Sequence, residues 1–412
     1  MESEINRFLR IREITEEIVS PLETEDFVVQ PIEDVSPPKW HLAHTTWFFE
    51  NFILVKFLTN YQLFDDQFAY LFNSYYESQG DRILRNTRGS LSRPTTARIF
   101  EYRKHVDKAM KLLFEKQHLM HEELLTFFEI GLNHEQQHQE LLITDIKYIL
   151  GSNPLLPVYH KTKTATLTAP LELNWLGVEA GVYEIGHSGK DFSFDNELGR
   201  HKVYLTDFEC MDRLVSNEEY LEFMQDGGYS NPALWLSEGW SWVEENKAEA
   251  PFYWYKKEDE WWNYTLHGAE KLNANAPVIH VNFYEAEAFA RWKGMRLLTE
   301  FEWEIAARRY GQNENAQFQD TQLYQPKYNQ GSNQFFGTAW EWTNSAYLPY
   351  PNYVQEAGAL GEYNGKFMIN QMVLRGGSCA TPKDHFRISY RNFFHAHLQW
   401  QFTGIRLARN KK

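Results

Sequence analysis

The spacing of apolar residues divides the chain into a helical first part and a second part of short, mixed elements. In the first part, apolar residues such as Ile11, Ile14 and Ile18 return every three or four positions, which is the period of an amphipathic helix. In the second part, short apolar runs such as 181–186 and 202–205 are separated by Gly, Asn, Asp and Pro, as is typical of short strands and loops. The pattern therefore predicts an α+β protein.

Breaker and capping residues set the limits of the predicted helices in the first part. A helix over 41–58 follows the breaker SPP. Thr95 or Thr96 is a suitable N-cap for a further helix that ends near Lys116. A long helix over 122–150 stops at the turn sequence GSNP. Together with the first helix, these segments predict an up-and-down four-helix bundle.

The domain limits follow from this change of pattern. We expect the helical bundle to occupy residues 1–151 and a mixed α/β domain to occupy residues 173–412. The intervening segment 152–172 is rich in Pro, Thr and Lys and lacks a helical period, so it is predicted to be a linker. Within the second domain, helices are expected over 216–225 and 284–292.

Composition supports the division and excludes several classes of protein. Of the 14 tryptophans, only Trp40 and Trp47 precede residue 170. The net charge of −15 argues against a general nucleic-acid binder, since phosphate binding needs a basic surface. Two cysteines are too few for a disulfide framework. No apolar run approaches the roughly 20 residues of a membrane span.

The N-terminal sequence is charged and lacks the apolar segment of a signal peptide. We therefore expect a cytoplasmic protein with neither a membrane nor a nucleic acid as its partner. The sequence leaves the oligomeric state open, and a homo-oligomer is among the states it allows.

The strongest candidate for chemistry is the sequence HEQQH, which contains His134 and His138. Residues four apart share one helix face, so both imidazoles can reach one metal ion. A third ligand has to come from elsewhere, and His41 and His44 on the early helix are candidates. Three neutral histidines suit Zn, Fe(II) or Cu. The alternative is a set of core or surface histidines without a ligand.

The same sequence fits the zinc-protease motif, with Glu135 as the general base. The extended form of that motif needs a glycine and a third histidine where Leu141 and Thr144 stand. The other form needs a carboxylate on a following helix, and Asp145 is too near on the same helix. The protease interpretation is therefore disfavoured.

A second candidate region begins at Tyr75 and Tyr76 and continues into an arginine-rich loop. A tyrosine beside a metal can donate a proton or an electron. Arg82, Arg85 and Arg88 are suited to bind substrate carboxylates. The alternatives are aromatic residues at the edge of the core and a solvated charged loop.

Five longer strings stand out in the second part: 277–282, 294–308, 338–343, 374–378 and 402–409. Taken alone, they indicate turns, caps and buried tryptophans. Together they resemble the formylglycine-generating, sulfatase-modifying domain, a mixed α/β fold related to C-type lectins. The first part, with its Leu-Ala-His string and its histidine pair, resembles the DinB-like metal-binding four-helix bundle. The two in this order resemble the ergothioneine-pathway sulfoxide synthases, or hercynine oxygenases, over nearly the whole chain.

This resemblance implies a non-haem Fe(II) cofactor and assigns residues to it. The metal ligands would be His44, His134 and His138, with His41 outside the triad. The resemblance places Gln137 against the substrate imidazole. In one subgroup, the tyrosines that correspond to Tyr75 and Tyr76 lie beside the iron and are the expected proton or electron donors. In another subgroup, the catalytic tyrosine corresponds to Tyr350.

The resemblance also implies substrate contacts. Asn392, Phe393 and Phe394 match a string that holds the trimethylammonium group of hercynine, N-α-trimethylhistidine. Some members have an aspartate at the last position, where this chain has Phe394, so aromatic packing or a cation–π contact is expected instead. The arginine-rich loop is expected to set the choice of thiol donor.

The implied reaction joins the thiol of cysteine or γ-glutamylcysteine to the imidazole C2 of hercynine, with O2 as oxidant, and gives a sulfoxide. Resemblance to the subgroup with two adjacent tyrosines favours free cysteine. Two alternatives remain, a synthase that joins a selenosugar to hercynine and a non-catalytic binding module of the same fold. Copper chemistry of the formylglycine-generating type is not expected, because only Cys379 follows Ser378 where those enzymes carry two nearby cysteines.

Overall fold

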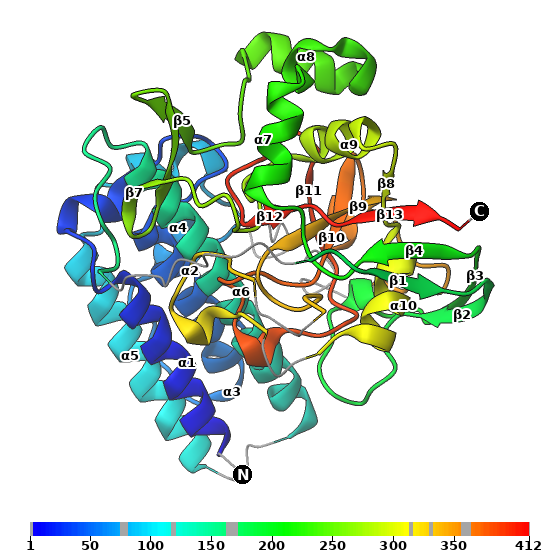
Figure 1. The fold of residues 1–412 in the computed structure, drawn as a ribbon. Helices are drawn as coiled ribbons and strands as arrows, with labels where there is room; N and C mark the ends of the chain where they lie inside the picture. Colours follow the sequence, from blue (N-terminus) through cyan, green and yellow to red (C-terminus); the bar gives the residue numbers. More distant parts are fainter. Residues whose placement is uncertain are drawn as a thin grey trace. The chain divides into compact units, whose positions relative to one another are not determined.

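The computed structural model describes residues 3–74, 81–116, 121–161, 172–312, 316–328, 333–355 and 364–411. This part of the chain forms two compact units (Figure 1). The first ends at His160, and the second contains the described residues from Lys161 onward. The expected linker 152–172 spans this division, and its residues 162–171 lie outside the described chain. A helical unit followed by a mixed unit confirms the predicted α+β class.

Four long helices build the first unit: α1 (Glu4–Val19), α2 (Pro38–Phe49), α5 (Thr96–Glu115) and α6 (Glu122–Gly151). Helices α1 and α2 each pack against both α5 and α6, so the four form a closed bundle (Figure 1). Two short helices, α3 (Val55–Phe57) and α4 (Phe68–Phe72), also belong to this unit. The predicted four-helix bundle is confirmed.

Helix limits follow the expected caps with one difference. The Thr95 hydroxyl accepts a hydrogen bond from the backbone N–H of Arg98, as expected of an N-cap. The helix predicted over 41–58 is interrupted, because a π-helical turn over Glu50–Leu54 separates α2 from α3. The buried Glu50 carboxylate at this turn accepts hydrogen bonds from the Tyr61 hydroxyl at 2.7 Å and the Tyr102 hydroxyl at 2.5 Å.

A glycine allows α6 to approach α2 closely. A Cβ atom on Gly131 would lie 2.7 Å from Cε1 of Phe49, closer than real side chains come. Any larger residue at this position would require the rings of Phe48 and Phe49, or the helices themselves, to move. The close approach matters because α2 and α6 carry the four candidate histidines.

A buried ion network fixes the rotation of α6 in the bundle. The Glu135 carboxylate accepts hydrogen bonds from Arg12 Nη1 at 2.9 Å, from Arg103 Nη2 at 3.1 Å and from the Thr15 hydroxyl at 2.8 Å. Burial raises the pKa of Glu135, but the two guanidinium groups outweigh it and hold that pKa below its usual value. Arg12 Nη2 also donates to the Thr46 hydroxyl, at 2.9 Å. The network therefore connects all four helices.

The second unit contains two four-stranded sheets. The first is antiparallel, in the order β1 (Trp175–Val178), β4 (Phe208–Met211), β13 (Leu407–Asn410), β8 (Arg296–Leu297). The second has the order β11 (Asn392–His395), β10 (Gln371–Arg375), β9 (Trp340–Ala346), β12 (Thr403–Gly404). In it, β12 runs parallel to β9 and the other neighbours are antiparallel.

The second unit also contains smaller elements, most of which are labelled in Figure 1. They are the hairpin of β2 (Gly181–Ile185) and β3 (His201–Leu205), and the three-stranded sheet of β5 (Trp254–Lys257), β6 (Glu260–Thr265) and β7 (Gly268–Lys271). The helices are α7 (Asn217–Gln225), α8 (Ser237–Asn246), α9 (Phe283–Trp292) and α10 (Glu300–Tyr310). Helices α7 and α9 confirm the two helices that the pattern predicted there.

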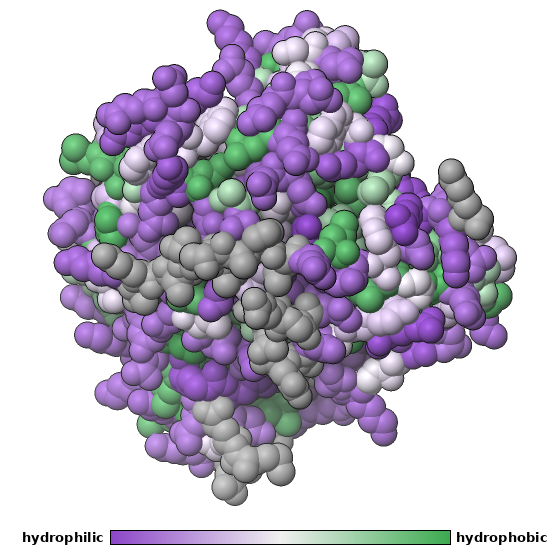
Figure 2. Space-filling model, viewed as in Figure 1, coloured by the Kyte–Doolittle hydropathy of each residue, from purple (hydrophilic) through white to green (hydrophobic). Residues whose placement is uncertain are grey.

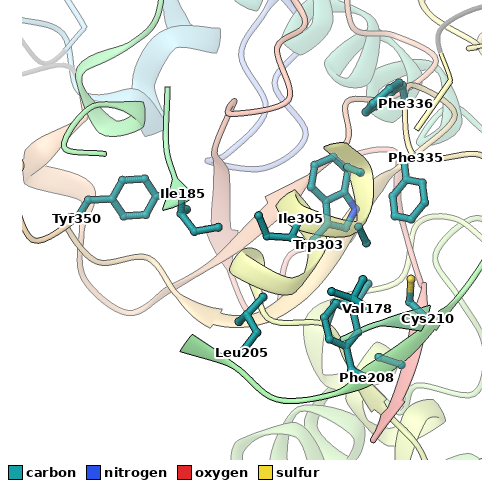
Figure 3. Close-up of a cluster of buried hydrophobic side chains, with 14 of the residues drawn as sticks. Val178, Ile185, Leu205, Phe208, Cys210, Trp303, Ile305, Phe335, Phe336 and Tyr350 are labelled. Carbon is teal, nitrogen blue, oxygen red and sulfur yellow. The ribbon is translucent and has the colours of Figure 1, made fainter. Parts of the chain in front are cut away.

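The core of the second unit gathers around Trp303 of α10 (Figure 3). Its ring meets Phe335 edge-on at 5.9 Å, and its indole N–H donates to Glu341 at 2.7 Å. Glu341 is paired in turn with the fully buried Arg406. Both cysteines, Cys210 and Cys379, are buried, and neither forms a disulfide.

The surface differs in character from this core. On the face drawn in Figure 2, hydrophilic side chains predominate and apolar ones are scattered between them. Among the helices that the structure describes, none has the length and apolar content to cross a membrane.

We predict that Glu135→Gln destabilises the bundle by about 3–5 kcal/mol, because it removes the fully buried carboxylate that Arg12 and Arg103 share. Each guanidinium group then keeps only its second carboxylate partner, Asp107 for Arg12 and Glu16 for Arg103. Urea unfolding followed by helical circular dichroism measures this. The matched control is Glu123→Gln, which breaks a surface pair with Lys56 and should cost less than about 1 kcal/mol. Equal effects of the two substitutions would contradict the role assigned to Glu135.

Candidate metal centre

Three of the predicted histidines come together on the facing sides of α2 and α6. One nitrogen from each of His44, His134 and His138 lies within 4.8 Å of the other two. The ring centroids are 4.6–5.0 Å apart. His44 and His134 are buried and His138 is 9% exposed. A metal ion placed among these nitrogens could be bound by all three imidazoles.

The orientation of His44 leaves one nitrogen available. Its Nδ1 lies 2.7 Å from the backbone carbonyl of Phe72, and since a carbonyl only accepts, Nδ1 carries the proton. Nε2 is then the bare nitrogen, and it has no hydrogen-bond partner among the described residues. The ring is stacked between Trp40, at 4.5 Å, and Trp47, at 5.5 Å. These contacts fix the ring before any metal binds.

His138 is held from its other side. Its Nδ1 lies 2.9 Å from Nδ1 of His41, and Nε2 of His41 lies 3.0 Å from Oδ2 of Asp145. His41 therefore contacts a member of the triad and lies outside it. Asp145 also accepts a hydrogen bond from the backbone N–H of Ser36 at 2.9 Å.

The three histidines are electrically neutral at pH 7. Burial lowers the pKa of His134 to about 3, and it also lowers those of His44 and His138, with added repulsion from the neighbouring histidines. Neutral imidazoles are the form that binds metals, and three of them suit Fe(II), Zn or Cu. Within the described chain, the metal-ligating groups gathered at this point are these three imidazoles.

Glu135 lies next to His134 in sequence but on another side of α6. Its carboxylate is bound by Arg12 and Arg103. It is therefore not available as the general base that a zinc protease needs. The geometry agrees with the earlier argument against a protease.

The tyrosine pair Tyr75 and Tyr76 lies outside the described residues, but the segment that leads to it is held beside the triad. The Phe72 carbonyl binds His44, and the Ser74 hydroxyl accepts from Arg88 Nη2 at 2.9 Å. Asn73, between them, is fully buried.

The three arginines of the loop have different surroundings. Arg88 is buried over the ring of Trp40, with 3.4 Å from its Cζ to the ring centroid, and Nη1 donates to the Ser36 hydroxyl. Arg82 is half-buried and donates to the Ser74 carbonyl at 3.0 Å. Arg85 is exposed and donates to the carbonyl of Asp34 at 2.5 Å.

The other expected substrate contacts are partly exposed. Gln137 is half-buried on α6 and directly precedes His138. In the second unit, the Asn392 side chain accepts from the N–H of Phe393, whose ring stacks on Tyr347 at 4.0 Å. Phe394 is half-buried, and its ring centroid lies 6.5 Å from that of Trp400.

Tyr350 is buried in the core of the second unit. Its hydroxyl donates to Glu300 at 3.2 Å, and the guanidinium of Arg391 lies over its ring at 4.0 Å. Burial beside Glu300 raises its pKa above the ordinary value. Its hydroxyl therefore already has a partner within its own unit.

Several residues at the centre were not identified from the sequence as parts of it. Trp40 and Trp47 stack on His44, the Phe72 carbonyl binds it, and Asp145 binds His41. The available signal for Asp145 was its position seven residues after His138, which is two helical turns along the same face of α6.

We predict that the metal-free protein loses stability as the pH falls from 6.5 towards 3. Below pH 6.5, His134 gains a proton in the unfolded chain, whereas in the folded chain it does so only near pH 3. The free energy of unfolding should therefore fall by about 1.4 kcal/mol per pH unit from this histidine alone. Urea unfolding at pH 7, 6 and 5 should show a shallower pH dependence in His134→Asn. Parallel curves for the two proteins would contradict this.

Comparison with known proteins gives two family matches. Residues 7–142 match the DinB superfamily, and residues 166–335 and 324–411 match the sulfatase-modifying factor enzyme 1-like domain. The second family therefore covers more than half of the chain.

Individual relatives match different shares of the chain. The hercynine oxygenase of Mycolicibacterium smegmatis is 32% identical over 314 residues, which cover 68% of this chain and 71% of the relative. That of Mycobacterium tuberculosis is 30% identical over 309 residues, with the same coverage. The formylglycine-generating enzyme of Thermomonospora curvata is 30% identical over 148 residues, 32% of this chain and 48% of that protein. A helical bundle with a histidine triad, the two matched families and these relatives agree: the chain belongs to the hercynine oxygenase family.

Proposed function

We propose that this protein is an Fe(II)- and O2-dependent hercynine oxygenase. It joins the thiol of cysteine or γ-glutamylcysteine to the imidazole C2 of hercynine and forms the sulfoxide. The observation that carries this proposal is the buried cluster of His44, His134 and His138, in a chain related over two thirds of its length to proteins named hercynine oxygenase. Of the two thiols, free cysteine is the proposed preferred donor.

The reaction balances without an external reductant. One S–H and one C2–H bond break, and one C–S and one S=O bond form. The two substrates together lose four electrons, which is the number that reduces O2. One oxygen atom enters the sulfoxide, and the other leaves as water with the two hydrogen atoms.

The fit of Fe(II) rests on the chemistry of the three histidines. Their neutral imidazoles offer three nitrogen ligands and leave other coordination positions open for substrates. A bound Fe(II) ion supplies electron transfer to O2 and lowers the pKa of a coordinating thiol. His44, His134 and His138 would hold the ion. Trp40 and Trp47 keep His44 fixed, and burial of the triad limits the access of water.

Hercynine presents an imidazole, a carboxylate and a trimethylammonium group. Gln137 is the proposed partner of its imidazole, because the half-buried side chain directly precedes His138 on α6. Phe393 and Phe394 are the proposed aromatic contacts of the trimethylammonium group, with Asn392 beside them.

The thiol substrate carries at least one carboxylate. Arg82 and Arg85 are the proposed partners, because both side chains are at least partly exposed and both donate to a backbone carbonyl. Arg85 also lies 3.5 Å from the carboxylate of Asp34, so a substrate carboxylate would share or replace that contact. Arg88 was proposed for the same role. Arg88 is buried over Trp40 and donates to the hydroxyls of Ser36 and Ser74. These contacts favour a role in holding the segment around Ser74 in place over a direct contact with the substrate.

Tyr75 is the proposed proton or electron donor, with Tyr76 as the next candidate. Support comes from the residues just before it, since Phe72 binds His44 and Ser74 binds Arg88. The rival, Tyr350, has its hydroxyl on Glu300 in the core of the second unit. Because the Tyr350 hydroxyl already has this partner, Tyr75 and Tyr76 are the preferred candidates for the donor.

The reaction class is tested by anaerobic loading with Fe(II), followed by O2, hercynine and either cysteine or γ-glutamylcysteine, with mass spectrometry of the products. We expect the hercynyl-cysteine sulfoxide or its γ-glutamyl form, and the donor that reacts identifies the thiol. His134→Gln, which removes one ligand, should abolish product and iron content together. Iron-loaded protein that couples neither thiol would contradict the proposal and make a selenosugar the next substrate to test. Failure to bind iron would instead support a binding module.

The tyrosine assignment is tested by product ratios. Tyr75→Phe should shift products from the coupled sulfoxide towards oxidation of the thiol alone, by roughly 10²-fold in the ratio, since it removes the proton donor. Tyr76→Phe and Tyr350→Phe are compared in the same assay. Tyr70→Phe, at an exposed tyrosine of α4, is the matched control. An unchanged ratio in Tyr75→Phe would exclude Tyr75 as the donor.

A further inference from the structure

A row of three hydrogen-bonded side chains leads away from the candidate metal centre. Asp145 Oδ2 lies 3.0 Å from His41 Nε2, and His41 Nδ1 lies 2.9 Å from His138 Nδ1. All three side chains are buried, with 4%, 3% and 9% of their surface exposed. The row ends at a proposed metal ligand, so its hydrogen positions bear directly on metal binding.

The helices hold this row in place. His138 and Asp145 are seven residues apart on α6, which is two turns along one face. His41 belongs to α2 and lies between them. The backbone N–H of Ser36, just before α2, donates to the same Asp145 oxygen at 2.9 Å. The Asp145 side chain, which belongs to α6, is therefore also held by the backbone just before α2.

The row has a direction because Asp145 is placed as an acceptor. The oxygen that lies against His41 Nε2 also accepts the backbone N–H of Ser36, so we assign the hydrogen of this contact to His41 Nε2. In that tautomer His41 has a bare Nδ1, and the hydrogen between the two Nδ1 atoms belongs to His138. A neutral His138 with its hydrogen on Nδ1 has a bare Nε2. The lone pair of this Nε2 is what a metal ion needs.

We propose that His41 and Asp145 are positioning residues that fix His138 in the tautomer with a bare Nε2 before metal binds. The proposal rests on the histidine triad being the metal centre, as in the proposed function. His41 is not itself a ligand, but in this proposal it determines which ring nitrogen of His138 carries the hydrogen. His44 is fixed in the same tautomer by a different acceptor, the Phe72 carbonyl. Partners of this kind typically change metal affinity by about 10–100-fold.

The first test reads the tautomer directly in metal-free protein. Long-range ¹H–¹⁵N NMR with ¹⁵N-labelled histidine distinguishes a protonated from a bare ring nitrogen, and His138→Gln assigns the signal. We expect His138 with hydrogen on Nδ1 in the wild-type protein. Finding hydrogen on Nε2 of His138 instead would overturn the proposal without any variant of His41.

The second test measures affinity for Co²⁺ by its visible absorption. His41→Phe keeps a ring of similar size without nitrogen atoms and should weaken binding by about 10–100-fold. His41→Gln keeps an acceptor and a donor and should recover part of that loss. Asp145→Asn, which can donate as well as accept, should give a mixture of His138 tautomers.

The matched control is Asp107→Asn. Asp107 is a half-buried carboxylate of the bundle, and it binds Arg12 at 2.8 Å. We expect this variant to leave the His138 tautomer and Co²⁺ affinity unchanged. Folded His41→Phe protein with wild-type affinity would refute the proposal, and if that variant does not fold, unchanged tautomer and affinity in Asp145→Asn would do so.

These readouts separate the proposal from the proposed function. The tautomer and the Co²⁺ affinity do not depend on hercynine, a thiol or O2. A protein that binds Co²⁺ as expected and forms no coupled product would contradict the proposed function alone. A protein that forms the product with His138 in the other tautomer would contradict this inference alone.

Discussion

A buried carboxylate between two guanidinium groups determines which way α6 presents its side chains. Glu135 binds Arg12 of α1 and Arg103 of α5. Consecutive residues on an α-helix are about 100° apart, so a helix held by Glu135 turns His134 and His138 towards α2. Such buried pairs contribute little net stability but are costly to break. Their contribution here is to fix one rotation of α6, on which the position of the two histidines depends.

The candidate metal centre depends on three buried histidines that stay uncharged. Burial lowers the pKa values of all three histidines, so the folded chain takes up protons at these rings less readily than the unfolded chain does. Stacking of His44 on Trp40 and Trp47 adds favourable contacts. A bound metal adds its binding free energy to folding, because the unfolded chain offers no formed site. The bundle would therefore offer a metal ion ligands that are already oriented.

Helices and the histidine pair could be predicted from the sequence because both depend on local spacing. Periodicity and a threonine cap located α5, and the i, i+4 rule placed His134 and His138 on one face. The π-helical turn after α2 could not be predicted in this way, because it occurs at a residue whose partners, Tyr61 and Tyr102, are distant in sequence. The spacing of residues along the chain predicts helices, but it does not predict the contacts with distant residues that alter a helix locally.

The third ligand shows where sequence reasoning reached its limit. His41 and His44 are three residues apart on one helix, and their spacing alone did not decide between them. Family resemblance selected His44, and the structure places His44 in the triad and His41 behind His138. The contacts of Arg88 with Trp40 and of Tyr350 with Glu300 were likewise beyond reach, since both join segments far apart in the chain.

The most direct test of this account is the coordination of iron. X-ray absorption spectroscopy of the anaerobic Fe(II)-loaded protein should show three imidazole nitrogen ligands in the wild-type protein. The His44→Ala variant, with its bundle intact by circular dichroism, should show either one imidazole fewer or loss of the iron. Sulfur or carboxylate ligands in place of the imidazoles, or a spectrum that does not change in the variant, would contradict the assignment of the metal to His44, His134 and His138.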